Sequence, residues 1–100
     1  MIILTGSLSH FTLDQLRSAL GLGAVGRLGD DWDELFGEAK RTVSGASANV
    51  ELWRDVDSHV WRIDVEVAGD PPDSDVQSLL TAVRAEVEAA GVQIASVFRR

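Results

Sequence analysis

The feature that most constrains the fold is a pair of alternating segments, residues 48–56 and 59–68, around the two-residue turn Asp57-Ser58. Alternation of apolar and polar residues with a period of two predicts half-buried β-strands. If the two segments form a hairpin, cross-strand pairing puts their apolar positions on one face, so the register is self-consistent. These positions are Val50, Leu52, Trp61, Ile63 and Val65. The sequence therefore predicts an antiparallel hairpin with one buried face.

The second face of this hairpin is predicted to be charged. It carries Glu51, Trp53, Asp55, Arg62, Asp64 and Glu66. In the predicted register Trp53 lies opposite Arg62, so the guanidinium can stack on the indole in a cation–π contact. Trp53 is then either covered, by Arg62 or by another element, or exposed as an anchor for a partner. Both interpretations remain open.

Apolar spacing predicts the other elements. A continuous apolar run predicts a strand at residues 2–4 that is buried on both faces. Residues recurring at helical spacing predict three helices, and capping boxes begin the first and the third. The predicted helices span residues 12–20, 31–41 and 74–90, with a glycine-rich connector at 21–29 and a last strand at 92–98.

The predicted element order is β-α-α-β-β-α-β, in a single domain formed by residues 1–100. We expect an α/β sandwich in which a mixed four-stranded sheet packs against the helices. Two topologies fit this order. In a ferredoxin-like sheet the third strand lies beside the first. In the other topology the first, second and last strands form a parallel core, and the third strand is an antiparallel edge.

The charge balance restricts the class of partner. The chain carries 16 acidic and 9 basic side chains, and its formal charge is −7. Nucleic-acid binding needs surplus lysine and arginine for phosphate contacts, and this chain has a single lysine, Lys40. An acidic chain instead suits a basic protein partner, or gains solubility from its charge.

Composition also bears on the compartment. The chain has no cysteine, which excludes disulfides, thiolate metal sites and cysteine nucleophiles. Residues 1–6 lack the basic segment and the apolar length of a signal peptide. No segment reaches the ~20 apolar residues of a membrane span. We therefore expect a cytoplasmic protein that does not act on membranes.

Catalytic and metal-binding patterns are weak. His10 and His59 are the two histidines, and neither accompanies a nucleophile elbow or an oxyanion motif. Asp55, Asp57 and His59 are spaced by two around the predicted turn, but a solvated turn in which Asp57 bonds its own backbone accounts for this spacing. We expect no enzyme activity, no cofactor and no metal site.

Residues 29–36 are unusually acidic. Four carboxylates, those of Asp30, Asp31, Asp33 and Glu34, fall in the loop and first turn of the second predicted helix. Acids at a helix N-terminus are ordinary caps, because they complement free N–H groups and the positive end of the dipole. This number exceeds what capping needs. The surplus is either a solvated acidic surface or a surface offered to cationic groups.

In this segment the chain resembles the barstar family of intracellular ribonuclease inhibitors. Family members begin their second helix with Gly, a polar or acidic pair, Leu or Trp, and then Asp-x-Leu-Trp; residues 29–36 read Gly-Asp-Asp-Trp-Asp-Glu-Leu-Phe. Val-Glu-Leu-Trp-Arg at 50–54 is similar to the family's second strand. By position Asp33 matches the first inhibitory aspartate of the family, whereas the second falls on Gly37, with Glu38 adjacent.

The resemblance implies the parallel-core topology, barstar-like with an added edge strand, and a loop and helix start that plug a ribonuclease active site. We therefore expect a non-catalytic inhibitor or immunity-type protein, a monomer that blocks a basic enzyme, in particular a ribonuclease. The predicted partner-binding residues are Gly29, Asp30, Asp31, Asp33, Glu34, Glu38 and Trp53. The alternative is a ferredoxin-like regulatory or ligand-binding module that forms a homodimer through the open sheet face around Trp53.

Overall fold

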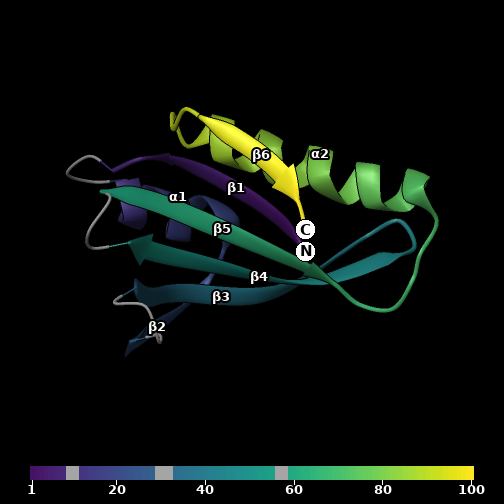
Figure 1. The fold of residues 1–100 in the computed structure, drawn as a ribbon, viewed down its shortest axis with the longest axis horizontal. Coiled ribbons are helices and arrows are strands. Elements are labelled where there is room, and N and C mark those ends of the chain that lie inside the picture. The colour runs from purple at the N-terminus through teal and green to yellow at the C-terminus, as the bar shows by residue number, and fades with distance from the viewer. Residues whose placement is uncertain (9–11, 29–32, 56–58) are drawn as a thin grey trace.

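The computed structural model describes residues 1–8, 12–28, 33–55 and 59–100. One antiparallel sheet and two helices make up this small α/β structure (Figure 1). The strands are β1 (Ile2–Ser7), β2 (Gly23–Leu28), β3 (Asp33–Val43), β4 (Ala46–Asp55), β5 (Val60–Val67) and β6 (Ser96–Arg99). The helices are α1 (Thr12–Leu20), which follows β1, and α2 (Asp73–Ala89), which follows β5.

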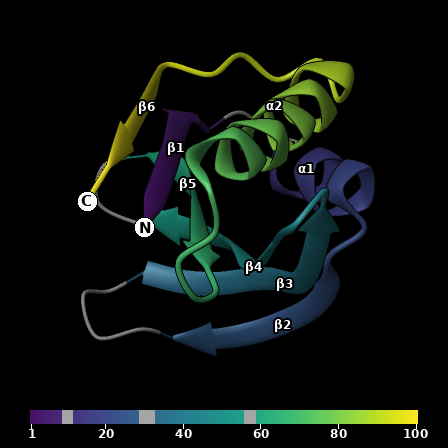
Figure 2. The same cartoon turned by 90° about the vertical axis from the view of Figure 1, so that its right-hand side faces the viewer.

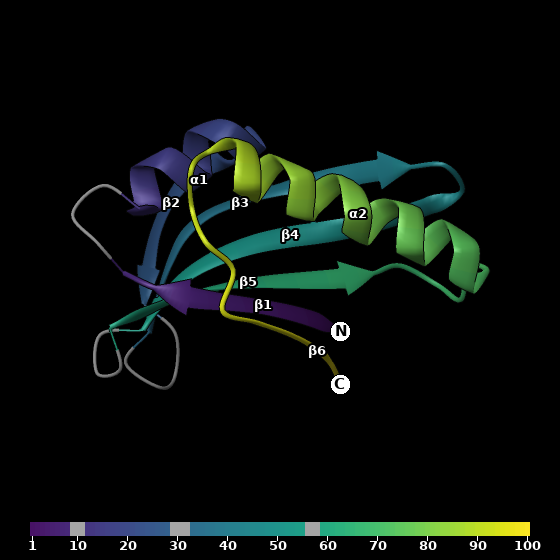
Figure 3. The same ribbon diagram turned by 90° about the horizontal axis from the view of Figure 1, so that it is seen from above.

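The six strands form one sheet in the order β2-β3-β4-β5-β1-β6, and all neighbouring strands are antiparallel. Both helices lie on the same side of this sheet, which curves around them (Figures 2 and 3). We call the helix-covered side the inner face and the other side the outer face. Because successive side chains of a strand alternate between the faces, the register assigns each strand residue to one of them.

The main hydrophobic core lies between the inner face and the two helices. Its fully buried members from the central strands include Leu4 of the predicted apolar run and the five positions that alternation had predicted: Val50, Leu52, Trp61, Ile63 and Val65. The helices contribute Leu16, Leu20, Val76, Leu79, Val83 and Val87. The predicted helical spacing of residues 76–87 is therefore confirmed as a buried stripe.

Trp61 packs directly on the backbone of β1. It is the register partner of Gly6, and a Cβ placed on Gly6 would lie 2.5 Å from the indole ring and 2.7 Å from the carbonyl oxygen of Gln93. A side chain larger than hydrogen therefore does not fit at this position. The glycine allows the largest core side chain to lie flat against the sheet.

The predicted hairpin register is confirmed. The structure pairs Val50 with Val65 and Leu52 with Ile63, and it places Trp53 opposite Arg62. The first predicted strand is also confirmed, and its apolar residues are buried on both faces. Gly21, with a φ of 64°, follows α1 and ends it in the left-handed conformation that glycine adopts readily.

The predicted helix at residues 31–41 is wrong. Residues 33–43 form β3, which pairs with β4 along its whole length, while residues 31 and 32 lie outside the described residues. A β-bulge at Phe36 explains the misleading pattern, because it puts two adjacent apolar residues, Leu35 and Phe36, in a strand and imitates helical spacing. Gly37 fits the close packing of β3 at this point, since a Cβ would lie 3.0 Å from the Cβ of Leu22.

The predicted connector at residues 21–29 is also wrong in part. Residues 23–28 form the edge strand β2, which pairs with β3. Its sequence, Gly-Ala-Val-Gly-Arg-Leu, has little alternation, so nothing local identifies it as a strand. The pairing with β3 supplies the backbone hydrogen bonds that local sequence does not predict.

Neither predicted topology is found. β5 does lie beside β1, as in the ferredoxin-like alternative, but it is antiparallel to β1, and so is β6. The chain passes from β1 through α1 to the far edge of the sheet and returns through β2, β3, β4 and β5 (Figure 3). The three successive antiparallel pairs β2–β3, β3–β4 and β4–β5 place β5 beside β1 and opposite to it in direction. The expected mixed four-stranded sheet is therefore corrected to a six-stranded antiparallel one.

Two predictions about the ends of elements also need correction. The capping box predicted for the third helix is not found, because α2 begins at Asp73 after the N-cap residue Pro72 and has no side-chain cap hydrogen bond. The last strand is shorter than predicted, because β6 begins only at Ser96. Within the described residues, neither helix is long and apolar enough to cross a bilayer.

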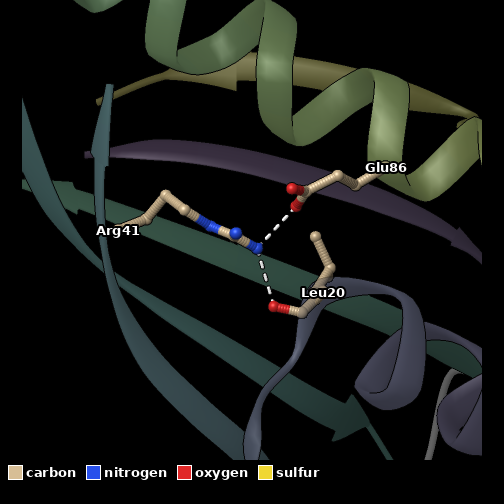
Figure 4. A network of polar contacts seen from close by, with 3 residues as sticks. All are labelled: Leu20, Arg41 and Glu86. Carbon is tan, nitrogen blue, oxygen red and sulfur yellow. Dashed lines mark hydrogen bonds and ion pairs between the residues drawn. The ribbon is translucent and has the colours of Figure 1, made fainter. Parts of the chain in front are cut away.

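Arg41 of the sheet forms polar contacts with both helices (Figure 4). It lies on the inner face of β3, where one terminal nitrogen is 2.6 Å from the carbonyl oxygen of Leu20 and 2.6 Å from Oε2 of Glu86. The first contact satisfies a carbonyl in the last turn of α1, and the second is an ion pair with α2. Because both described helices pack on the inner face, neither of them covers the outer face of β3, β4 and β5.

Candidate functional site

The outer face of the three strands β3, β4 and β5 is acidic. Among its described side chains, Glu38, Glu51, Asp55, Asp64 and Glu66 are acidic, whereas Lys40 and Arg62 are basic. The acids therefore outnumber the bases on a sheet face that neither of the two described helices covers. A surface of one predominant sign attracts partners of the opposite sign.

Three of these carboxylates form a row across neighbouring strands, which we call the acidic row. Glu38 of β3 is the register partner of Glu51 of β4, and Glu51 is the register partner of Asp64 of β5. Directly opposite side chains have Cβ atoms about 4.5–5.5 Å apart, and like charges at that spacing destabilise a sheet. A cationic group placed over the row would relieve this repulsion.

Trp53 lies beside the acidic row, between Leu35 of β3 and Arg62 of β5. The Arg62 guanidinium carbon is 5.4 Å from the centroid of the indole ring, so the predicted cation–π contact is confirmed. Trp53 is half-buried, and its indole nitrogen is buried without a hydrogen-bond partner. Of the two interpretations of Trp53, partial cover by Arg62 is therefore the one found.

Arg62 also contacts the acidic row. Its Nε donates a hydrogen bond to Oδ1 of Asp64 at 2.9 Å. Asp64 is only 7% exposed, and a carboxylate removed from water in this way needs a cation or hydrogen-bond donors close by. The acidic row thus holds one of the chain's own cations at its β5 end. At the β3 end, Glu38 has no ion-pair partner among the residues the structure describes.

A shallow hollow of about 630 Å³ adjoins this surface. Its outer-face lining includes Lys40, Asn49 and Glu66, which form the row next to the acidic row. Thr42 and Ser47, whose hydroxyls are 2.9 Å apart, close it toward the β3–β4 turn. The outer face therefore has a depression that can accommodate side chains of a partner.

The structure separates the predicted partner-binding residues. Gly29, Asp30 and Asp31 lie outside the described residues. Asp33 and Glu34 begin a strand and not a helix, so the predicted acidic helix N-terminus is wrong.

Glu34 in particular points away from the outer face of the sheet. Its register partner is Arg54, which in turn pairs with Trp61 on the inner face. Oε2 of Glu34 accepts a hydrogen bond from Arg54 at 2.7 Å. Glu34 therefore lies on the opposite face of the sheet from the acidic row and is not part of it.

Two of the predicted residues do come together. Glu38 and Trp53 lie on the outer faces of the neighbouring strands β3 and β4. Glu51 and Asp64, which join them, were predicted to lie on the charged hairpin face but were not counted among the partner-binding residues. The signal that could have included them is the register itself, since it places both beside Trp53. The proximity of Glu38 to these residues was not predicted, because residues 31–41 were expected to form a helix.

Within the described residues, no group of three or more histidine, aspartate and glutamate side chains is arranged to hold a metal ion. Asp57, one of the three residues weighed as ligands around the hairpin turn, lies outside those residues. The carboxylates of the acidic row are aligned across strands rather than convergent on one point.

Comparisons of the chain with protein-family models, with curated proteins and with solved structures found no match. The resemblance to the barstar family therefore stays a prediction from residues 29–36 and 50–54. The first of these segments was interpreted as a helix start, and its described part is a strand.

Proposed function

We propose that the chain is a non-catalytic inhibitor or immunity-type protein that binds a basic enzyme, a ribonuclease in particular, through the acidic outer face of its sheet. The observation that carries the proposal is the acidic row formed by Glu38, Glu51 and Asp64 on a face without helical cover. Ribonuclease active sites bind phosphates with basic side chains, and carboxylates can take the place of those phosphates. The proposed setting is the cytoplasm, where such an inhibitor would protect cellular RNA.

The whole-chain charge supports this assignment. A net charge of −7 steers a basic partner toward the molecule, and the local excess of carboxylates orients it toward the outer face. The cross-strand repulsion in the acidic row adds a second contribution, because binding a cation there removes an unfavourable interaction of the free protein. Both contributions weaken as ionic strength rises.

The test is charge removal on the acidic row without a change of shape. The double variant Glu38→Gln/Glu51→Gln should associate with a basic ribonuclease about tenfold more slowly than the original chain. The measurement is a stopped-flow association rate at low and high ionic strength, accompanied by inhibition of RNA hydrolysis over a panel of basic ribonucleases.

The matched control removes the same number of charges elsewhere. Asp70→Asn/Glu88→Gln changes two exposed residues outside the sheet, before and within α2, and should leave most of the association rate intact. Equal slowing by the two double variants would reduce the effect to net charge and would contradict the proposed face. Absence of binding to every ribonuclease in the panel would contradict the choice of enzyme class.

A further inference from the structure

Trp53 and Asp64 together hold a guanidinium group that belongs to the chain itself. Arg62 stacks at 5.4 Å from the Trp53 ring centroid and donates from Nε to Oδ1 of Asp64 at 2.9 Å. All three side chains lie on the outer face of β4 and β5. These are the two central strands of the sheet (Figure 1). An aromatic ring combined with a carboxylate is the chemistry by which proteins recognise arginine side chains.

The geometry suits a guanidinium better than an ammonium. A guanidinium is planar, so it can stack on a ring while its N–H groups donate within its own plane, whereas an ammonium is a compact and strongly hydrated point charge. Asp64 is largely removed from water, which favours the more weakly hydrated cation. The side chain of Arg62 is nevertheless 30% exposed, so the site is reachable from solvent.

The surrounding charge allows a second cation to enter. Asp64 ends the acidic row, whose other members are Glu51 and Glu38. If an incoming arginine takes the position over Trp53, Arg62 remains attached to β5 beside the same row. The exchange therefore raises the number of cations on the outer face by one and lowers its internal repulsion.

We propose that Arg62 is the internal occupant of an arginine-binding site formed by Trp53 and Asp64, and that an arginine of the partner replaces it on docking. The proposal rests on the proposed function, since it assigns the partner's contact within the same outer face. Arg62 then acts as a built-in competitor. It covers Trp53 in the free protein and makes the site selective for partners that offer a guanidinium.

The experiment compares two peptides of equal length, oligo-arginine and oligo-lysine, binding to the original chain and to Arg62→Met. Methionine keeps an apolar stem over Trp53 but removes the competing cation. We expect Arg62→Met to bind oligo-arginine about tenfold more tightly than the original chain does, with a clearly smaller gain for oligo-lysine. Adding Trp53→Leu to Arg62→Met should abolish the arginine-specific gain. Titration calorimetry measures the affinities.

The control is Lys40→Met, which removes another outer-face cation without opening the site. It should give a small gain that is the same for both peptides. Equal gains in Arg62→Met and Lys40→Met, or an equal gain for arginine and lysine in Arg62→Met, would overturn the proposal. Thermal unfolding verifies each variant, and Arg62→Gln provides the same comparison should Arg62→Met not fold.

The outcomes separate this proposal from the function on which it rests. If Glu38→Gln/Glu51→Gln weakens peptide binding but Arg62→Met shows no preference for arginine, the acidic face remains and the arginine site is wrong. If neither Glu38→Gln/Glu51→Gln nor Arg62→Met changes peptide binding, the assignment of the acidic outer face as the binding surface is wrong.

Discussion

At the scale of single residues, Arg41 is the polar contact on which the helix packing most depends. Its guanidinium bonds an α1 carbonyl and an α2 carboxylate at once, and both ion-pair partners are less than one-third exposed. Replacing it leaves Leu20 O and Glu86 without this donor in a partly buried setting, which costs more than the loss of a surface pair.

We therefore expect Arg41→Met to lower the free energy of unfolding by about 2 kcal/mol, measured by urea denaturation. Arg54→Met is the matched control, because Arg54 also bridges to a glutamate at 2.7 Å but its side chain is 45% exposed. Its loss should cost less than about 1 kcal/mol. Similar costs for the two variants would show that Arg41 does not link the helices to the sheet.

At the scale of elements, the pairing of β1 with β5 depends on Gly6, which leaves room for the indole of Trp61. Gly6→Ala would force a methyl group against the fully buried Trp61 and a backbone carbonyl, neither of which can move cheaply. We expect a loss of about 2–3 kcal/mol in unfolding free energy. Calorimetric unfolding would register it as a lower midpoint temperature.

Gly23→Ala is the control for this prediction. Gly23 is also a strand glycine, but the nearest atom to an added Cβ there is a carbonyl oxygen at an ordinary 3.5 Å. Its replacement should change stability by no more than about 0.5 kcal/mol. Comparable losses at both positions would point to a general cost of losing strand glycines and not to the contact with Trp61.

The elements also differ in how far local sequence predicts them. α1, α2 and the β4–β5 hairpin were predictable because each carries a clear period, of 3.6 or of 2, along its own length. β3 was not, because the bulge at Phe36 interrupts its alternation and leaves apolar spacing that also fits a helix. β2 was not, because its glycines carry no side-chain pattern and its pairing with β3 supplies its order.

At the scale of the whole molecule, the negative charge of the outer face opposes self-association of the chain. The alternative of a homodimer through the outer face would bring two acidic rows together, and like charges across an interface cost several kcal/mol. We therefore expect sedimentation equilibrium to give a monomer of 10.8 kDa at moderate ionic strength. A dimer that persists under these conditions and is lost on Trp53→Asp would contradict the inhibitor proposal and favour the homodimer.

The register of the central hairpin, the buried stripes of both helices and the acidic charge could all be predicted from the amino-acid sequence. These depend on neighbours a few residues apart, whose alternation is set by backbone geometry. Three features depend on long-range strand pairing: residues 33–43 form a strand, β5 lies antiparallel to β1, and Glu38 joins Glu51 and Asp64. These features were not predicted, because strand pairing joins segments far apart in the chain, and the residues of one strand do not specify which distant strand will be its partner.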